Sequence, residues 1–356
     1  MRVKLEDVCE RGSSNIKQSD IIKMSGNYPI YGASGLAGKV SFYHQEQPYV
    51  AVVKDGAGIG RTTLNPAKSS VIGTMQYLIP KKNVLPEYLF YVVSYMHLEK
   101  YYTGATIPHI YFKDYKNEEF NLDNIEKQLE IIDVLGRCKK VIEARKQELV
   151  ELDSLTKARF VEMFGDPRSN PFGFEKKRLK DTCKVITGNT PSRAIEEYYG
   201  DYIEWIKTDN IVSGILNPTQ ATESLSEKGM NVGRTVEKDS ILMACIAGSI
   251  ASIGRVCITD RTVAFNQQIN AVVPEQYNIL FLYVLFQMSK DYLVEDINMA
   301  LKGILSKSKL EEKEFIIPPM DLQEQFSDFV KQVDKSKLNK IAARWPAKAV
   351  TQFFFS

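Results

Sequence analysis

The chain has 356 residues, of which 44% are apolar and 25% are charged, the balance of a water-soluble protein able to form more than one buried core. Its formal net charge of +2 excludes a uniformly basic nucleic-acid-binding protein, and the lack of any apolar stretch of about 18 residues excludes a membrane-spanning helix. Five scattered cysteines without a CxxC pair, and an N-terminus without a signal-peptide core, predict a cytoplasmic protein with reduced thiols.

Residues 1–118 are predicted to form the first of two α+β domains. Runs of β-branched and aromatic residues predict strands within 40–53 and 69–80. Residues 86–102 carry apolar side chains at helical spacing, and residues 103–115 have the glycine, proline and aromatic residues of a loop. This order predicts a domain dominated by antiparallel strands with one helix.

A glycine-rich stretch, KDGAGIGR at residues 54–61, follows the apolar run 49–53 as a dinucleotide-binding loop follows its first strand. Such a loop opens a helix at its last glycine, whereas here Gly60 is followed by β-branched residues and a proline. The glycines therefore predict a tight turn between two strands, with positive φ angles, rather than a nucleotide site.

Residues 119–166 are predicted to form a long spacer helix. Between Leu122 and Phe164 there is no proline and the only glycine is Gly136, and Gly-Asp-Pro at 165–167 ends the pattern. At 1.5 Å per residue the helix is about 65 Å long, more than one small domain can cover. Its apolar stripe has coiled-coil spacing and consists of Ile125, Leu129, Ile132, Leu135, Cys138, Ile142, Leu149, Leu152 and Leu155.

Residues 167–318 are predicted to form a second α+β domain, with strands within 201–211, 239–247 and 262–274 and a helix within 277–297. The order of strands and helix matches that of the first domain. The sequence therefore predicts two tandem domains of one fold class.

Residues 319–356 are predicted to form a second amphipathic helix and a tail. Trp345-Pro346 interrupts the pattern, so this helix is expected to be shorter than the first. We expect the two helices to pack against each other in antiparallel fashion and to hold the globular parts apart. The second stripe consists of Leu322, Phe326, Phe329 and Val333.

The two halves are predicted to be copies of one another. Ile-Gly-Arg occurs at 59–61 and again at 253–255, and other short matches keep the same order with slowly drifting offsets. The second copy of the glycine-rich stretch, AGSIASIGR, has lost the glycine spacing, which again argues against a nucleotide site. The other matching pairs are 5–9 with 179–183, Pro80 with Pro274, 89–93 with 281–285, and 122–128 with 319–325, the last at an offset of 197.

Several stretches carry a family resemblance: GNYPIYGASGLAGKV and VVKDGAGIGR in the first half, KARFVEMFGDPRSNPFGFEKKRLKD at the junction, and ITGNTPSR, YIEWIKTDNI and FNQQINAV in the second. With a long helix after each of two unlike α+β domains, the chain resembles the specificity subunit of Type I restriction–modification systems over nearly its whole length. The resemblance implies that each globular part is a target recognition domain reading half of a split site in double-stranded DNA, with the helices as spacers. The short second helix departs from the family pattern.

The resemblance also implies a non-catalytic chain that works inside a complex. Methyltransferase subunits would dock on its helices and restriction subunits would join through them. Those partners would bind S-adenosylmethionine, Mg²⁺ and ATP, so that this chain holds no cofactor and no metal. Because the two domains differ in sequence, the predicted DNA site is bipartite and asymmetric.

Charge distinguishes the two predicted domains. Residues 1–115 contain 13 Lys and Arg against 9 Asp and Glu, whereas residues 175–317 contain 17 against 19, so the second domain must segregate its charges to face DNA. Cations can meet phosphates or guanine and amides can pair with adenine, although a solvated surface role stays open for each residue. The candidates are Lys54, Arg61, Gln76, Thr106, His109, Tyr111 and Lys113 in the first domain, and Arg193, Lys207, Asn210, Arg255, Asn266, Gln267, Gln268, Asn270 and Lys302 in the second.

Two other functions stay open. Asn170-Pro171-Phe172-Gly173 is similar to the Asn-Pro-Pro-aromatic motif of amino methyltransferases, which would suit a self-sufficient DNA methyltransferase. It lacks the second proline, follows a helix end rather than a strand and has no glycine-rich cofactor motif beside it, so we expect an interdomain turn. The second alternative is an adaptor without DNA binding, in which a coiled coil joins two domains.

Overall fold

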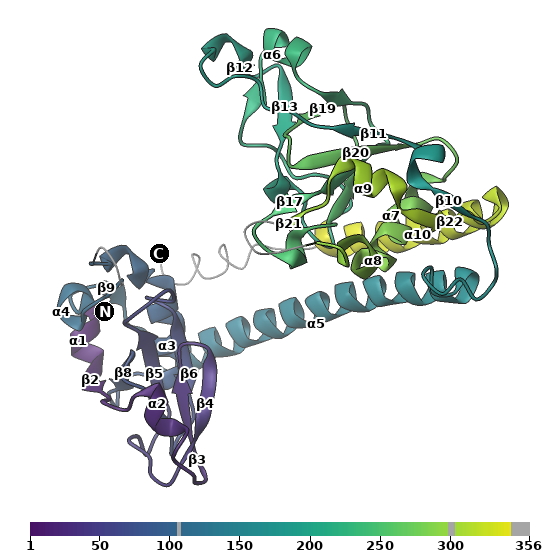
Figure 1. Ribbon diagram of the computed structural model, residues 1–356. Coiled ribbons are helices and arrows are strands. Elements are labelled where there is room, and N and C mark those ends of the chain that lie inside the picture. The colour runs from purple at the N-terminus through teal and green to yellow at the C-terminus, as the bar shows by residue number, and fades with distance from the viewer. Residues whose placement is uncertain (105–107, 298–302, 343–356) are drawn as a thin grey trace. The chain divides into compact units, whose positions relative to one another are not determined.

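The computed structural model describes residues 1–104, 108–297 and 303–342, with the backbone alone for 338–342 (Figure 1). Internal contacts divide the described chain into unit 1, Met1–Arg145, and unit 2, Lys146–Ala342. Both units mix short strands with helices, which is the predicted α+β organisation.

The main sheet of unit 1 is antiparallel. β5 (Tyr49–Val53) has the sequence Tyr-Val-Ala-Val-Val and is buried along its whole length because both faces of the sheet are covered. Val50 and Val52 pack in one core with helix α3 (Pro86–Tyr95), and the alternate residues of β5 pack in a second core. The strand order is β2 (Cys9–Ser13), β8 (Met75–Pro80), β5 (Tyr49–Val53), β6 (Thr62–Asn65).

A second sheet and a terminal strand pair complete unit 1. β3 (Tyr28–Gly32) pairs antiparallel with β4 (Gly35–Val40) and parallel with β7 (Ser70–Val71). The first and last strands of the unit, β1 (Arg2–Lys4) and β9 (Glu119–Asn121), pair with each other. The short helices are α1 (Leu5–Val8), α2 (Gln18–Ile21), η1 (Leu98–Tyr101) and α4 (Phe112–Tyr115).

Unit 2 repeats this plan with a larger second sheet. Its antiparallel main sheet has the order β11 (Cys183–Thr187), β20 (Ile269–Pro274), β16 (Ile241–Ala244), β18 (Val256–Ile258). Its second sheet, in which β13 and β19 are parallel, has the order β12 (Tyr199–Gly200), β14 (Ser224–Leu225), β13 (Ile203–Ile206), β19 (Val263–Phe265), β15 (Thr235–Val236).

The remaining elements of unit 2 include a terminal strand pair like that of unit 1. β10 and β22, its first and last strands, pair with each other as β1 and β9 do. These elements are β10 (Lys176–Arg178), η2 (Leu179–Asp181), η3 (Glu196–Tyr198), η4 (Thr208–Asn210), α6 (Glu227–Val232), β17 (Ile246–Ala247), η5 (Ile250–Ser252), α7 (Ile279–Met288), α8 (Lys290–Val294), β21 (Gly303–Ile304), α9 (Lys307–Glu312) and β22 (Glu314–Ile316).

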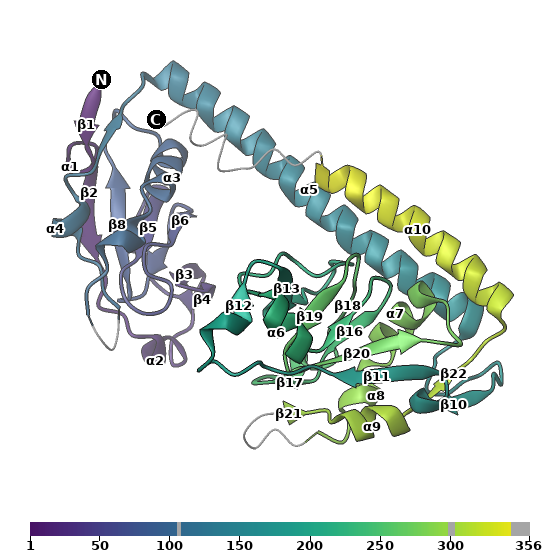
Figure 2. The same cartoon turned by 90° about the horizontal axis from the view of Figure 1, so that it is seen from above.

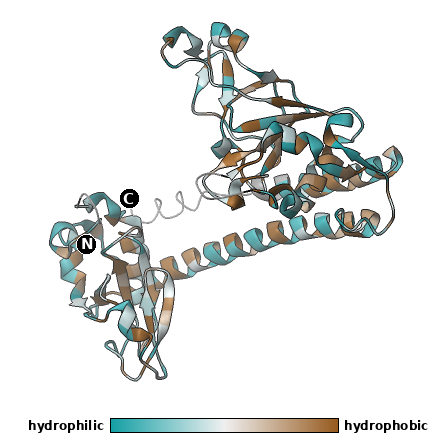
Figure 3. Ribbon diagram, viewed as in Figure 1, coloured by the Kyte–Doolittle hydropathy of each residue, from teal (hydrophilic) through white to brown (hydrophobic). Residues whose placement is uncertain are grey.

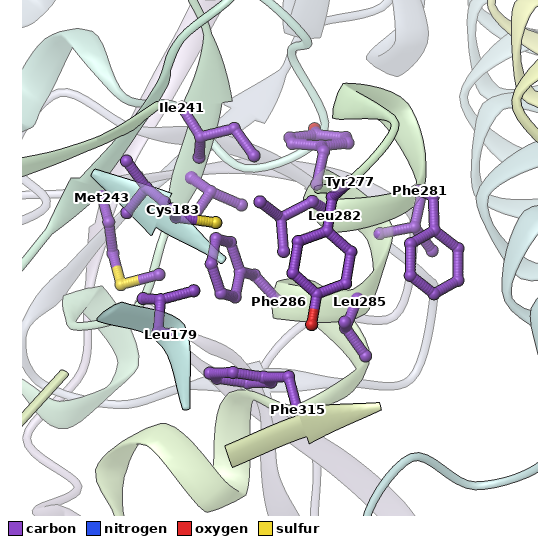
Figure 4. Packing of buried hydrophobic residues seen from close by; sticks show 14 of the residues in the cluster. Leu179, Cys183, Ile241, Met243, Tyr277, Phe281, Leu282, Leu285, Phe286 and Phe315 are labelled. Carbon is purple, nitrogen blue, oxygen red and sulfur yellow. The ribbon is translucent and has the colours of Figure 1, made fainter. Parts of the chain in front are cut away.

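Helix α7 lies in the core of unit 2. Its first turn is capped by the Asn278 side chain, which accepts from Leu280 N at 3.0 Å. Figure 4 shows Phe286 of α7 among Met243 of β16 and Phe315 of β22, with the Phe286 and Phe315 ring centroids 5.3 Å apart. The helix is apolar on nearly every side because it is covered on nearly every side.

Equivalent hydrogen bonds close the same hairpin in both units. Gly60 N donates to Val53 O (2.9 Å) in unit 1, and Gly254 N donates to Ala244 O (2.8 Å) in unit 2. The φ angles of these glycines are +79° and +75°, and a Cβ on Gly60 would lie 2.6 Å from the backbone N of Glu99. The predicted duplication and the predicted strand–turn–strand form of KDGAGIGR are therefore confirmed.

The long helix is confirmed as α5 (Ile125–Phe164), whose 40 residues span about 60 Å. It begins later than predicted, because Glu119–Asn121 form β9. The second helix, α10 (Met320–Ala342), has 23 described residues, and the tail 343–356 lies outside the described part of the chain.

A buried glutamine fixes the start of each long helix. Gln128 Oε1 accepts from Leu85 N and Gln323 Oε1 accepts from Asn278 N, both at 2.9 Å, and Leu85 and Asn278 are the N-cap residues of α3 and α7. The two amides are 0% and 1% exposed. This equivalence corrects the predicted offset of 197, which aligned Gln128 with Gln325 instead of Gln323.

Within unit 2, α10 lies antiparallel beside the last turns of α5 (Figure 2). Phe326, early in α10, packs on Phe160 with ring centroids 5.5 Å apart, and Lys337, late in α10, forms an ion pair with Asp153 (2.7 Å). Figure 3 shows polar and apolar residues alternating along α5. The antiparallel helix pair is thus present where both helices belong to unit 2.

The predicted apolar stripe of α5 is partly wrong as a description of packing within the chain. Ile125, Leu129 and Leu155 are 39%, 54% and 49% exposed. The faces that are buried are set instead by contact with each unit's core. They contain Gln128, Ile131 and Leu135 at one end and Thr156, Phe160 and Phe164 at the other, whereas Ile132, Ile142, Leu149 and Leu152 are half-buried. In α10, Phe326 and Val333 are buried and Leu322 and Phe329 are half-buried.

Candidate nucleic-acid interface

Three loops of unit 1 meet at one end of its main sheet. Lys54 N and Asp55 N, in the β5–β6 loop, donate to Thr74 O at 2.9 and 3.3 Å. Ile110 N donates to Lys54 O at 2.9 Å, so the chain before α4 joins the same group. The first loop cluster consists of residues 54–61, 72–74 and 108–113.

Unit 2 builds the same arrangement with different side chains. Cys245 N and Ile246 N donate to Gln268 O at 2.8 and 3.2 Å, and Leu305 N donates to Cys245 O at 2.8 Å. These bonds are equivalent to those around Lys54, so the duplication places two loop clusters on two copies of one frame. The second loop cluster consists of residues 188–193, 207–210, 245–255 and 266–268.

The first loop cluster presents two cations, an imidazole and an exposed phenol ring. His109 Nδ1 lies 2.6 Å from Asp55 Oδ1, and the His109 ring stacks beside Tyr111 at 6.3 Å between centroids. Lys113 Nζ lies 5.3 Å from the Tyr111 centroid, and Tyr111 is 51% exposed. The predicted candidates Lys54, His109, Tyr111 and Lys113 are thus brought together by the fold. An exposed aromatic ring flanked by cations can contact both bases and phosphates.

The second loop cluster joins two predicted cations to two rings and one carboxylate. The Arg193 guanidinium lies 4.4 Å from the Tyr199 centroid and 5.1 Å from the Trp205 centroid. Glu223 forms ion pairs with Arg193 (2.6 Å) and with Lys207. Hydrogen bonds from Lys207 and Arg193 hold the pKa of the Glu223 carboxyl below its ordinary value, so it is ionised near neutral pH.

Two candidates, Arg61 and Arg255, hold the frame together. Arg61 Nη1 donates to Ala33 O (2.9 Å), and Arg255 Nη2 donates to Thr208 O (3.2 Å). Each acceptor lies just after the strand that pairs in parallel fashion, so the two bonds are equivalent. The arginine of each Ile-Gly-Arg thus links the hairpin to the second sheet by a hydrogen bond. This is a structural role in addition to any contact with DNA.

Four predicted amides are buried and satisfied within the chain, and we no longer expect them to contact bases. Burial removes them from the surface, and their hydrogen bonds would have to break first. Asn270 Oδ1, for example, accepts from Thr187 Oγ1 at 2.8 Å. The four are Gln76, Asn210, Asn266 and Asn270, with exposures of 3–7%.

Gln267 is exposed and its Oε1 accepts from Thr190 Oγ1, whereas Gln268 is half-buried. Thr106 and Lys302 lie outside the described residues.

Sequence patterns did not single out Asp55, Tyr199, Trp205 or Glu223. Trp205 lies in the stretch YIEWIKTDNI that carries the family resemblance, but the contacts of its ring with two cations were not predicted, because Arg193 comes from a separate segment of the chain.

The Asn170-Pro171-Phe172-Gly173 stretch forms a turn, as the sequence predicts, but the turn lies within unit 2, between α5 and β10, and not between the two units. Asn170 Oδ1 accepts from Phe174 N (2.9 Å) and its Nδ2 donates to Phe174 O (2.7 Å). With φ angles of +50° at Asn170 and +70° at Gly173, both amide atoms of Asn170 are used to close the turn.

Groups suited to chemistry are scarce in the described ranges. No three His, Cys, Asp or Glu side chains there are grouped to hold a metal ion, and no described helix is long and apolar enough to cross a membrane. Burial raises the pKa values of the Cys9, Cys183, Cys245 and Cys257 thiols to about 12, which makes them poor nucleophiles.

Comparison with known proteins gives one family. The model of the Type I restriction modification DNA specificity domain matches residues 1–153 and 171–344, one match for each repeat. The HindI specificity subunit of Haemophilus influenzae is 35% identical over 117 residues, covering 32% of this chain and 24% of the relative. The MjaIX specificity subunit of Methanocaldococcus jannaschii is 25% identical over 289 residues, covering 74% and 65%.

A solved structure has the same fold. The S subunit of a Type I restriction–modification system from M. genitalium matches with a TM-score of 0.60 and 13% identity, covering 99% of this chain and 93% of that one. The sequence matches therefore span at most about two thirds of the curated relatives, while the fold match spans nearly all of the solved chain.

Proposed function

Because the chain belongs to the Type I restriction modification DNA specificity family, we propose that it is the non-catalytic, DNA-reading subunit of a Type I restriction–modification complex. It reads a bipartite, asymmetric site in double-stranded DNA, one half with each loop cluster. It acts in the cytoplasm, where its DNA target lies.

The observation that carries this proposal is the pair of loop clusters. Equivalent backbone bonds hold both, around Lys54 in unit 1 and Cys245 in unit 2. The side chains on this common frame differ: His109 and Tyr111 in one, Arg193 and Lys207 in the other. A repeated frame with different side chains suits the reading of two different half-sites.

Contacts of two kinds follow from the exposed groups. Lys54, Lys113, Arg193 and Lys207 are suited to backbone phosphates, which position the protein without reading sequence. Tyr111 and Gln267 are suited to base edges, since a ring packs on a base or methyl group and an amide pairs with adenine.

The helices dock the methyltransferase subunits in this proposal. Exposed apolar side chains occur along α5, including Leu129, Val141, Val150 and Leu155 at 49–58% exposure. Restriction subunits join through the methyltransferase subunits. We assign S-adenosylmethionine, Mg²⁺ and ATP to those partners.

Mapping of modified adenines tests the proposal. The chain and its methyltransferase subunits are expressed in a host free of DNA modification, and methylation-sensitive sequencing reads the genome. We expect one sequence with two unlike half-sites around an unread spacer. A symmetric or continuous sequence, or methylation by the chain alone, would contradict the proposal.

A matched pair of variants then assigns the half-sites. Tyr111→Ala is expected to relax the sequence of one half-site, and Gln267→Ala that of the other. Each variant should leave the opposite half unchanged, because the substituted side chains lie in different units. Relaxation of both halves by one substitution would contradict the division of labour.

A further inference from the structure

Glu223 bridges the two cations of the second loop cluster. Its Oε2 accepts from Arg193 Nη2 at 2.6 Å, and its Oε1 accepts from Lys207 Nζ. The three side chains come from three separate segments and are 36%, 56% and 27% exposed for Glu223, Arg193 and Lys207. One carboxylate therefore neutralises two cations at a partly open surface.

The cations are also held by contacts that do not involve Glu223. Arg193 lies against the Tyr199 and Trp205 rings, and Lys207 Nζ lies 5.1 Å from the Trp205 centroid. The loop that carries Arg193 is anchored because Tyr199 Oη donates to Pro191 O at 2.6 Å. Removal of the carboxylate would therefore leave both cations near their present positions.

A backbone phosphate matches what the carboxylate does here. A phosphodiester carries one negative charge and two free oxygens, and guanidinium and ammonium groups bind it as they bind a carboxylate. Residues 175–317 contain 17 basic and 19 acidic residues, so unit 2 has no excess of positive charge to attract DNA. It therefore depends on a local group of cations to bind a phosphate. Cations already paired with protein carboxylates attract DNA weakly.

We propose that Glu223 occupies the position of one DNA phosphate in the free chain and must leave it when DNA binds. The inference rests on the proposed DNA-reading function and adds a regulatory role. By competing with phosphate, Glu223 weakens contact with DNA of arbitrary sequence. Only DNA that makes further contacts with the second loop cluster displaces it.

The chain offers a control with the same chemistry at another place. Glu312 also bridges a lysine and an arginine, with Lys180 at 2.5 Å and Arg178 at 3.4 Å, beside β10 and α9. Glu223→Gln and Glu312→Gln change the net charge equally. A general electrostatic effect should therefore appear in both, and release of a phosphate site only in the first.

The test measures binding of the assembled complex to a random-sequence duplex over a range of salt concentrations. Glu223→Gln should raise affinity about fivefold at moderate salt and steepen the salt dependence by about 0.9, the value for one more neutralised phosphate. Glu312→Gln should change neither. Arg193→Gln with Lys207→Gln, added to Glu223→Gln, should abolish the gain.

The outcomes separate the two hypotheses. A wild-type complex that binds no duplex at any salt concentration overturns the proposed function and the inference together. Wild-type binding with equal effects of Glu223→Gln and Glu312→Gln, or a gain that survives loss of both cations, overturns the inference alone. Melting curves confirm folding, and Glu223→Ala provides a second variant with the same expected gain.

Discussion

Units 1 and 2 start their long helices in the same way but cover them differently. Gln128, Ile131 and Leu135 of α5 meet the core of unit 1 with the same spacing at which Gln323, Phe326 and Val330 of α10 meet the core of unit 2. Unit 2 gains an additional aromatic layer, because Phe160 and Phe164 of α5 pack on Phe326. The packing of the start of the long helix on the core is thus the same in both copies, while in unit 2 the end of α5 packs against α10 as well.

The aromatic layer gives the largest expected effect. Phe326→Ala should destabilise unit 2 by about 4 kcal/mol, because it opens a cavity among Phe160, Phe164 and Phe281. Hydrogen exchange should show the loss in unit 2 and leave unit 1 protected. Ile131→Ala is the matched change in unit 1 and should do the reverse. Equal loss in both units from either variant would break the comparison.

The buried glutamines should show the strongest equivalence. Gln128→Met and Gln323→Met should each cost about 1–2 kcal/mol, since each leaves a partly buried N-cap amide without its acceptor. Urea unfolding measures the change. Gln325→Met is the control: this exposed residue is the one that the sequence offset would pair with Gln128. A cost at Gln325 as large as at Gln323 would refute the structural alignment.

The two linking arginines separate framework from DNA contact. Arg61→Met and Arg255→Met should each lower stability by about 1–2 kcal/mol through loss of the bonds to Ala33 O and Thr208 O. Lys113→Met should not alter stability, but should reduce the salt dependence of DNA binding by about 0.9. Thermal melting and salt titration together check this. If both arginine variants are as stable as wild type, the structural role of Arg61 and Arg255 is wrong, and both remain candidates for contact with DNA.

A pH effect of less than about 1 kcal/mol is expected at Glu204 in unit 2. Burial alone would raise the pKa of this carboxyl, but hydrogen bonds from Arg261 and from Ala221 N (2.8 Å) lower it. A lowered folded-state pKa stabilises unit 2 above the unfolded value, about 4.3, and this stability is lost as pH falls below it. Urea midpoints between pH 6 and 3 should fall less in Glu204→Gln. Glu196→Gln, an exposed carboxylate in the same unit, should behave like wild type.

Local patterns predicted the features that depend on one segment. The turn at Gly60 followed from the residues after it, and α5 followed from its spacing and the lack of proline. The duplication followed from matches kept in order. The alignment of the two long helices at Gln128 was predicted wrongly by two residues. Short sequence matches allow such a shift, whereas the hydrogen bond that each glutamine accepts from an N-cap amide shows that Gln128 is equivalent to Gln323.

The candidate interface was harder to predict because it depends on burial and on distant partners. Asn270 and Arg193 are both polar residues near loops, yet Asn270 is buried in β20, where it bonds to Thr187 of the neighbouring strand β11, whereas the Arg193 side chain is 56% exposed. Glu223 shows the same limit. Its role as a bridge between two cations depends on Arg193 and Lys207, which lie 30 and 16 positions away in the sequence.

The pairing of β1 with β9, and of β10 with β22, ties the entry and exit of each globular part to one place. A segment whose ends are joined in this way can be exchanged for another without moving the points of attachment. Under the proposed function, recombination within the intervening gene segment would replace one half of the recognised sequence and leave the other half as it was. New specificities would arise by cassette replacement rather than by gradual redesign.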